Sequence, residues 1–230
     1  MKEKTLLSWS GGKDCALTLY EIQKTGNCEI SALLSTVTKD YDRISMHGIR
    51  RVLLEQQVAS LGFPLEKVLI SKNASNDEYE SEMRAVLERY LAAGVSAVVF
   101  GDIFLEDVRK HREENLSKIK MKGLFPIWRR DTAELAETFI DLGFKAIITC
   151  VDSKALDETF VGRVFNKQFL SELPSNVDPC GENGEFHSFV YEGPIFQEKI
   201  LHTVGEVILR DNRFYYCDLI PVQMDSIIDT

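Results

Sequence analysis

Long apolar runs are missing from this sequence. No stretch approaches the roughly eighteen apolar residues of a membrane-spanning helix, and the first residues hold no apolar signal segment. We therefore expect no contact with a membrane and a cytoplasmic location. The five cysteines are odd in number, widely spaced and free of any Cys-x-x-Cys pair, which argues against a disulfide framework and against a zinc site.

Basic residues are also in short supply. The chain has 27 Lys and Arg against 36 Asp and Glu, giving a formal net charge of −9. Because affinity for nucleic acid comes largely from clustered Lys and Arg, this balance opposes a nucleic-acid partner. The 230 residues are 44% apolar, which is enough for a substantial core. Whether the protein is a homo-oligomer is left open by the sequence.

Two common phosphate-binding loops are absent as well. A Walker A loop requires Gly-Lys followed by Ser or Thr, and a dinucleotide fingerprint requires Gly-x-Gly-x-x-Gly after the first strand. The chain has instead Ser-Gly-Gly-Lys-Asp-Cys at Ser10–Cys15, directly after an apolar strand and before a helix. Glycines there leave main-chain N–H groups open to an anion, and a helix N-terminus and a lysine add positive charge. The run predicts a nucleotide phosphate site, the alternative being an ordinary glycine turn.

Strands and helices alternate regularly through the first half of the chain. This pattern predicts a mainly parallel sheet with helices on both faces, in which ligands bind at the carboxyl ends of the strands. We expect a Rossmann-like, HUP-type α/β domain over residues 1–129, followed by a smaller α+β domain over 130–230. The expected strands include 30–37, 97–100, 124–128 and 145–151, and the expected helices include 14–24, 105–121 and 163–173.

Polar residues follow the strand that ends near Phe100. Asp102 is placed to hold Mg²⁺ or orient a phosphate, or else to cap the next helix. Arg109 and Arg112 are three residues apart on that helix and suit a clamp for an anionic group, although an exposed ion pair of Arg109 with Glu106 is an equal alternative. His47 precedes a glycine and suits either a site or a plain turn.

A second polar loop spans Asp178–Ser188. It combines Cys180, Glu182, Glu185 and His187 within eight residues. We expect it to bind substrate, with Glu185 and His187 serving an amine, ammonia or an activated acyl group. A nucleophilic Cys180–His187 pair and a plain surface loop are the alternatives.

Four segments together resemble the diphthine–ammonia ligase family of the PP-loop (N-type ATP pyrophosphatase) superfamily. They are Ser10–Asp14, Met46–Arg50, Gly101–Ile103 and Cys180–Ser188, the last followed by Gly193–Phe196. Cys15 departs from the serine usual in this loop, and Phe-His-Ser at 186–188 departs from the more typical Tyr-Glu-Thr. We expect the helix N-terminus to lower the pKa of the Cys15 thiol if solvent reaches it.

The resemblance implies an ATP-dependent, AMP-forming ligase. It implies ammonia as nitrogen donor and an acceptor carboxylate on elongation factor 2 as partner. Lys13, Asp14, Asp102, Glu185 and His187 are the expected catalytic residues, and Asp14 and Asp102 the expected Mg²⁺ ligands. The expected ATP contacts are Ser8, Ser10, Gly11, Gly12, Lys13, Asp14, Cys15, Leu34, Ser35, His47 and Gly101. The expected substrate contacts are Arg109, Arg112, Cys180, Glu182 and Glu185. A tRNA-modifying PP-loop enzyme and a nucleotide-sensing module without turnover remain as rivals.

Overall fold

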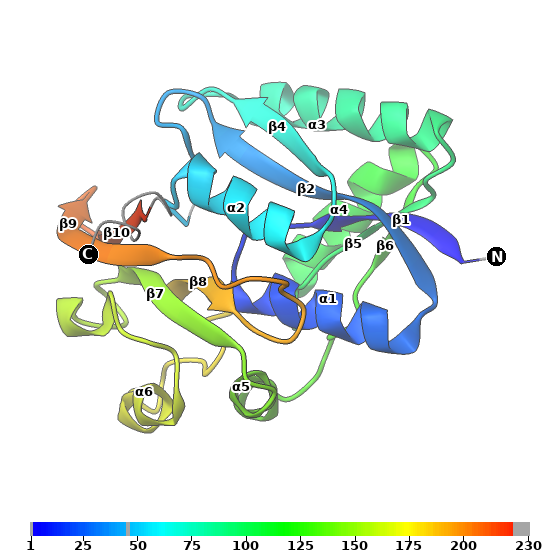
Figure 1. Cartoon of the computed structure of the whole chain (residues 1–230). Helices are drawn as coiled ribbons and strands as arrows, with labels where there is room; N and C mark the ends of the chain where they lie inside the picture. The colour runs from blue at the N-terminus through cyan, green and yellow to red at the C-terminus, as the bar shows by residue number, and fades with distance from the viewer. Residues whose placement is uncertain (1, 45–46, 223–230) are drawn as a thin grey trace, which may run out of the picture.

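The alternating first half of the chain forms a six-stranded sheet. The computed structural model describes residues 2–44 and 47–222, and Figure 1 shows this sheet with helices on both sides. Its elements in chain order are β1 (Glu3–Ser8), α1 (Lys13–Thr25), β2 (Cys28–Thr38), β3 (Arg43–Ile44), α2 (Arg51–Leu61), β4 (Leu65–Ile70), α3 (Asn76–Ala92), β5 (Ala97–Val99), α4 (Glu106–Lys118) and β6 (Lys122–Leu124). β1, β2, β4, β5 and β6 run parallel, whereas the short β3 pairs antiparallel with β2.

Each face of the parallel sheet buries its own apolar cluster. α1 and α2 cover one face through residues such as Leu19 and Leu53, and this cluster continues into the second half of the chain. α3 and α4 cover the other face, where Leu87 and Leu116 pack on Leu6 and Val98 of the strands. Strands buried on both faces explain why these segments are almost continuously apolar.

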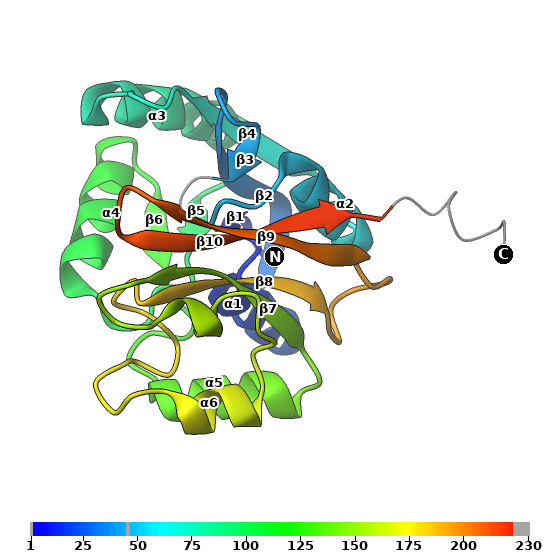
Figure 2. The same cartoon turned by 90° about the vertical axis from the view of Figure 1, so that its left-hand side faces the viewer.

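The second half of the chain forms a four-stranded antiparallel sheet. Its elements are α5 (Thr132–Asp141), β7 (Lys145–Asp152), the 3-10 helix Glu158–Phe160, α6 (Lys167–Glu172), β8 (Phe186–Glu192), β9 (His202–Arg210) and β10 (Phe214–Pro221). The strand order is β8-β7-β10-β9, with every neighbouring pair antiparallel. In Figure 2, α5 and α6 lie together on the side of this sheet that faces away from the parallel sheet.

The expected α/β class is confirmed, with a parallel sheet followed by a smaller unit of antiparallel strands and helices. The domain boundary at 129/130 stays a prediction. Three element assignments differ from expectation. The strand expected at 124–128 ends at Leu124, because Pro126 cannot donate to a ladder and the next residues turn. α6 begins only at Lys167, where the side-chain oxygen of Asn166 accepts from the Phe169 N–H. β8 begins inside the segment expected to be a loop.

No helix among the described residues is both long and apolar enough to cross a membrane.

Candidate functional site

The glycine loop after β1 lies where the two sheets meet. Gly11 has a φ of 81°, a left-handed conformation that favours glycine, and it turns the chain from β1 into α1. Its carbonyl accepts from the Val190 N–H of β8 at 2.9 Å, so the edge strand of the second sheet is attached to the loop of the first. The Lys13 N–H donates to Ser188 Oγ at 3.2 Å, and the Gly12 N–H to Ser10 Oγ at 3.3 Å. Two of the loop N–H groups that suit an anion are therefore hydrogen-bonded to serine hydroxyl oxygens.

An inner cavity of about 280 Å³ opens in front of this loop. Three segments far apart in sequence form its wall: the glycine loop, the end of β5 and the loop that leads into β8. Its lining comprises Ser8, Ser10, Gly12, Lys13, Asp14, Cys15, His47, Phe100, Gly101, Asp102, Arg112, Gly181, Glu182, Gly184, Phe186, His187 and Ser188. The structure thus brings together most of the site residues expected from the sequence.

Lys13 is buried at the centre of this wall. Its Nζ donates to both carboxylate oxygens of Asp14, at 2.7 and 2.8 Å, and to the carbonyl oxygen of Cys180. Burial is the largest single influence and works to lower the pKa of Lys13, but the charge and hydrogen bonds of Asp14 together with the charges of Cys180 and Glu182 outweigh it, so the pKa is raised and the lysine stays charged. The ammonium also lies 5.6 Å from the centroid of the Phe186 ring. A cation is therefore fixed where the loop residues converge.

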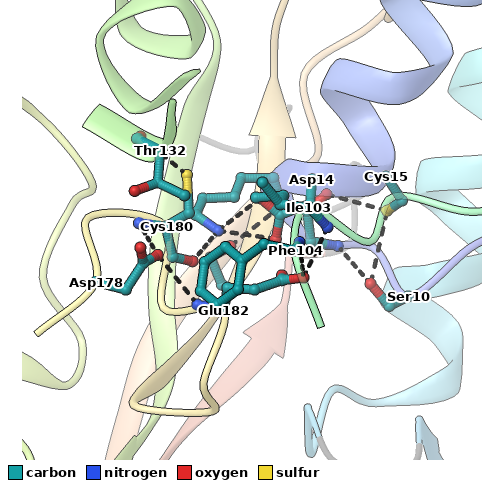
Figure 3. Close-up of polar contacts among 12 residues, drawn as sticks. Ser10, Asp14, Cys15, Ile103, Phe104, Thr132, Asp178, Cys180 and Glu182 are labelled. Atoms are coloured by element: carbon teal, nitrogen blue, oxygen red, sulfur yellow. Dashed lines mark hydrogen bonds and ion pairs between the residues drawn. The ribbon is translucent and has the colours of Figure 1, made fainter. Parts of the chain in front are cut away.

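Glu182 joins two of the segments that form the inner cavity. One of its carboxylate oxygens accepts from the N–H groups of Ile103 and Phe104, at 2.7 and 3.3 Å, as Figure 3 shows. Burial raises the pKa of Glu182 to about 7 against the opposing effect of these hydrogen bonds. Asp178 shapes the same loop by accepting from the N–H groups of Cys180 and Glu182. The Glu182 carboxylate therefore holds its loop against the end of β5, and its pKa lies near neutral pH.

Two histidines line the cavity beside the glycine loop. The rings of His47 and His187 lie 4.7 Å apart, and His47 Nδ1 is 3.3 Å from the Ser188 carbonyl oxygen. Burial lowers the pKa of His47 to about 4 and that of His187 to about 3, where the charges of His47 and Lys13 act in the same direction. Both rings are neutral at physiological pH. Met46, which belongs to the motif expected here, lies outside the described residues.

A larger sheet-edge cavity of about 610 Å³ adjoins the inner cavity. Ser8, Ser10, His47, Phe100 and Arg112 line both of them. Its other walls are largely apolar and come from the ends of β2 and β4 and from α3 and α4, among them Leu34, Ile70, Met83, Leu87 and Val98. An apolar hollow beside a loop whose N–H groups suit an anion also suits the base of a nucleotide.

Asp102, which lines the inner cavity, forms an ion pair with Arg112, which lines both cavities. Arg112 Nε lies 2.7 Å from Asp102 Oδ2, and its guanidinium carbon lies 4.4 Å from the centroid of the Phe100 ring. The described residues contain no group of three or more His, Cys, Asp and Glu able to hold a metal. Asp14 and Asp102 nevertheless both face the inner cavity, and Mg²⁺ commonly takes one or two carboxylates together with substrate phosphates. The donor set fits Mg²⁺ held jointly with a nucleotide.

Four expected site residues have surroundings that differ from the sequence prediction. Arg109 pairs with Glu113 at 2.8 Å and stacks on Phe125 and Trp128, so it does not converge with Arg112 in a clamp. Ser35 is buried and donates to the Trp9 carbonyl oxygen at 2.6 Å, lining neither cavity.

Glu185 and Cys180 also point away from the inner cavity. Glu185 Oε1 accepts from the Asp178 N–H and from Asn183 Nδ2, which holds the loop together from within. The Cys180 thiol donates to the Thr132 carbonyl oxygen at 3.2 Å, and burial raises its pKa to about 12. This geometry does not support a nucleophilic pair of Cys180 with His187.

Cys15 does not meet the condition under which a lowered pKa was expected, because solvent does not reach its thiol. Its thiol is buried, donates to the Gly12 carbonyl oxygen at 3.0 Å and lies 3.6 Å from Ser10 Oγ. Burial raises the pKa of Cys15 to about 11, whereas the helix N-terminus alone would lower it. A serine hydroxyl could make the same contacts, so cysteine at this position preserves the local hydrogen bonding.

Gln57 is a site residue that the sequence reasoning missed. It is fully buried on α2, and its Nε2 donates to the carbonyl oxygens of Gly11 and Val190, at 3.0 and 2.6 Å. Its Oε1 accepts from the Trp9 indole at 2.7 Å. The available signal was a lone amide on an otherwise apolar helix face that includes Leu53, Leu54 and Leu61.

Comparisons with known proteins cover both halves of the chain. Residues 3–123 match the model of the diphthamide synthase N-terminal domain, and residues 131–217 match that of the diphthamide synthase C-terminal domain. A diphthine–ammonia ligase of Danio rerio is 25% identical over 225 residues, covering 88% of each chain. The Mus musculus enzyme of the same name is 29% identical, covering 87% of this chain and 83% of its own. Among solved structures, the U34-tRNA thiolase NcsA of Methanococcus maripaludis matches with 15% identity and a TM-score of 0.39, covering 62% of this chain and 58% of its own.

Proposed function

Because the chain belongs to the diphthamide synthase family, we propose that it is an ATP-dependent, AMP-forming ligase that amidates an acceptor carboxylate with ammonia. The observation that carries this proposal is the meeting of the glycine loop, Lys13 and the loop of Glu182 around one cavity that adjoins an apolar hollow. This arrangement can hold the phosphates and the base of one nucleotide at once. The relatives named diphthine–ammonia ligase make diphthine on elongation factor 2 the acceptor that we propose.

The reaction has two steps. An acceptor carboxylate oxygen attacks the α-phosphorus of ATP, and the bond to the β-phosphate oxygen breaks to release pyrophosphate. Ammonia then attacks the acyl carbon, loses a proton and displaces AMP, which leaves the acceptor as an amide. Stabilising the departing pyrophosphate is the main catalytic demand of the first step.

The glycine loop and Lys13 meet that demand. The N–H groups of Gly12 and Lys13 exchange their serine hydroxyl partners for phosphate oxygens, and the Lys13 ammonium, already held in the cavity wall, balances the charge. Asp14 and Asp102 would hold Mg²⁺, which neutralises phosphate charge when bound. The base packs in the apolar sheet-edge cavity beside Leu34.

The second step uses residues of the loop that leads into β8 and of the start of β8, which also line the inner cavity. Glu182, with a pKa raised to about 7, is suited to accept the proton that the attacking nitrogen loses. His187 is neutral and lines the same cavity, so it can orient the acceptor or ammonia without adding charge. Glu185 stabilises the loop from beneath and Arg109 lies outside the cavities, so we assign neither to the chemistry.

A product assay tests the proposal. The protein is incubated with ATP, Mg²⁺, ammonium chloride and elongation factor 2 that carries diphthine, and each component is left out in turn. We expect AMP and pyrophosphate only in the complete mixture, together with the amidated acceptor by mass spectrometry. ADP and phosphate as products would contradict the proposal. Tight ATP binding without turnover would favour the nucleotide-sensing alternative.

A further inference from the structure

A third cavity, of about 870 Å³, lies beside the nucleotide region and has no part in the reaction described above. We call it the outer cavity. It lies between the ends of β2 and β3 and the hairpin of β9 and β10, and its lining includes Tyr41, Lys72, Glu206, Arg210, Asp211 and Tyr216. Figure 2 shows this hairpin crossing beside β3 and β4.

The outer cavity shares a wall with the sheet-edge cavity. Thr38, Ile44 and Lys72 line both of them. His47 and Gly48 lie between the outer cavity and the phosphate region, because Gly48 lines the outer cavity while His47 lines the inner one. A molecule in the outer cavity therefore has the nucleotide as its immediate neighbour.

An ion-pair cluster fixes the hairpin at this position. Asp218 of β10 accepts from Arg43 at 3.0 Å and from Arg50 at 2.6 and 3.1 Å, and these arginines hold the pKa of Asp218 at about 2. Tyr216 packs directly on Gly48, where an added Cβ would lie 2.8 Å from the tyrosine ring. The wall of the outer cavity is thus built by specific contacts between the two halves of the chain.

Two cations of this lining form no ion pair within 4 Å among residues 2–44 and 47–222, although a hydrogen bond with Tyr41 and the charges of Asp211 and Asp40 raise the pKa of Lys72. Lys72 Nζ lies 5.0 Å from the centroid of the Tyr41 ring, and the Arg210 guanidinium carbon lies 5.9 Å from the ring centroids of both Tyr41 and Tyr216. Among the described residues neither Lys72 nor Arg210 forms an ion pair, whereas Arg43 and Arg50 both pair with Asp218.

Negative charge lies on the same lining. Glu206 and Asp211 both face the outer cavity and, within the described part of the chain, form no ion pair. Their carboxylates and the Tyr216 ring suit a bound cation, while Lys72 and Arg210 suit a bound anion. Both signs of charge beside tyrosine rings favour a ligand that is itself zwitterionic over a simple anion.

We propose that the outer cavity binds the acceptor side chain as a zwitterion, together with the polypeptide that carries it, before adenylation. Lys72, at the border of the nucleotide cavity, and Arg210, in the lining of the outer cavity alone, attract the carboxylate, and Glu206, Asp211 and Tyr216 receive the cationic group. This inference rests on the proposed function, since it assumes that the acceptor is a carboxylate-bearing side chain of a protein.

Binding measurements on charge-reversal variants test the inference. Arg210→Glu and Glu206→Lys change residues that line the outer cavity alone, and Lys39→Glu is the matched control because Lys39 is exposed nearby and lines none of the three cavities. The probes are elongation factor 2 that carries diphthine and the unmodified factor. Dissociation constants for each are measured by interferometry, and that for ATP by calorimetry.

We expect the wild type and Lys39→Glu to bind the diphthine form at least tenfold more tightly than the unmodified form. Both cavity variants should lose most of that preference while their affinity for ATP changes less than threefold. If both variants keep the preference, or if the wild type has none, the inference is overturned. If the variants bind ATP more weakly but keep the preference for the diphthine form, the outer cavity is an extension of the nucleotide site, and the inference is overturned as well. Selective binding without AMP formation would contradict the proposed function and leave this inference standing.

Discussion

The side-chain amide of Gln57 donates to the carbonyl oxygen of Gly11 across 3.0 Å and fixes the orientation of the glycine loop from the side opposite the cavity. The same amide donates to Val190 of β8, so one buried side chain holds α2, the loop and the second sheet together. A glycine loop is conformationally permissive, and its N–H groups bind an anion well only when the backbone is held in place. Gln57 provides that support without touching a ligand.

Replacing Gln57 with Leu should lower both stability and ATP affinity. The change removes the Gln57 partner of the Val190 carbonyl and of the Trp9 indole and leaves the Gly11 carbonyl with only the Val190 N–H, which is expected to reduce the free energy of unfolding by about 2 to 4 kcal/mol. Urea unfolding and calorimetry with ATP measure the two effects. Gln56→Leu, at the neighbouring and less buried position, is the control and should change neither by much. Full ATP affinity in a folded Gln57→Leu protein would show that the loop needs no such support.

Lys13→Ala should weaken ATP binding at least tenfold. It removes the cation of the inner cavity and leaves Asp14 and the Cys180 carbonyl without their donor, so the free energy of unfolding should also fall, by about 1 to 3 kcal/mol. Lys24→Ala serves as the control, because Lys24 is exposed in the last turn of the same helix. Calorimetry that finds unchanged ATP affinity in the Lys13 variant, with full turnover, would remove the glycine loop as the phosphate site.

Stability should decline as the pH falls below about 6.5, partly through the histidine pair. The pKa of His47 is lowered to about 4 and that of His187 to about 3, against about 6.5 in an unfolded chain. Between these values the unfolded state binds more protons than the folded state, so the free energy of unfolding is full above about pH 6.5 and falls toward pH 4.

Urea unfolding of His187→Gln across this range checks the contribution of the pair. The variant should show a shallower loss of stability between about pH 6.5 and 4.5 than the wild type, because one of the two groups no longer titrates. His111→Gln, at an exposed position on α4, should keep the wild-type slope. An unchanged slope in His187→Gln would mean that the pKa of this histidine is the same in the folded and the unfolded state.

Glu182→Gln and Glu185→Gln should separate chemistry from loop stability. In Glu182→Gln the new amide oxygen can still accept from the Ile103 N–H, so this variant should fold, bind ATP within about threefold of the wild type and lose at least tenfold in amidation rate. Glu185→Gln should alter stability more than rate, because that carboxylate binds only its own loop. A large loss of rate in a stable Glu185→Gln protein would restore Glu185 to the catalytic residues expected from the sequence.

The sequence was sufficient for features whose causes are local. The glycine loop depends on Gly11 and on the strand and helix beside it, and the parallel sheet follows from alternating apolar segments, so both were predictable. The surroundings of Arg109 were not, because its helical spacing to Arg112 says nothing of the aromatic rings that Phe125 and Trp128 place beside it.

Contacts between the two halves of the chain were the least predictable part. Glu182 reaches Ile103 across 79 positions, and Gln57 reaches Val190 across 133. Such pairs depend on how β8 packs against the glycine loop, which no local pattern encodes. The burial of Cys15 was not predictable either, and it raises the pKa of a thiol for which a lowered value was expected only on exposure to solvent.

Oxygen transfer from the acceptor to AMP tests the central claim most directly. Elongation factor 2 that carries diphthine labelled with ¹⁸O in its carboxylate is incubated with the protein, ATP, Mg²⁺ and ammonium, and the AMP is analysed by mass spectrometry. If the carboxylate attacks the α-phosphorus, the bridging oxygen remains with AMP when nitrogen displaces it, so each AMP formed should carry one ¹⁸O. Unlabelled AMP, or ADP in its place, would contradict an acyl-adenylate route and with it the ligase that we propose.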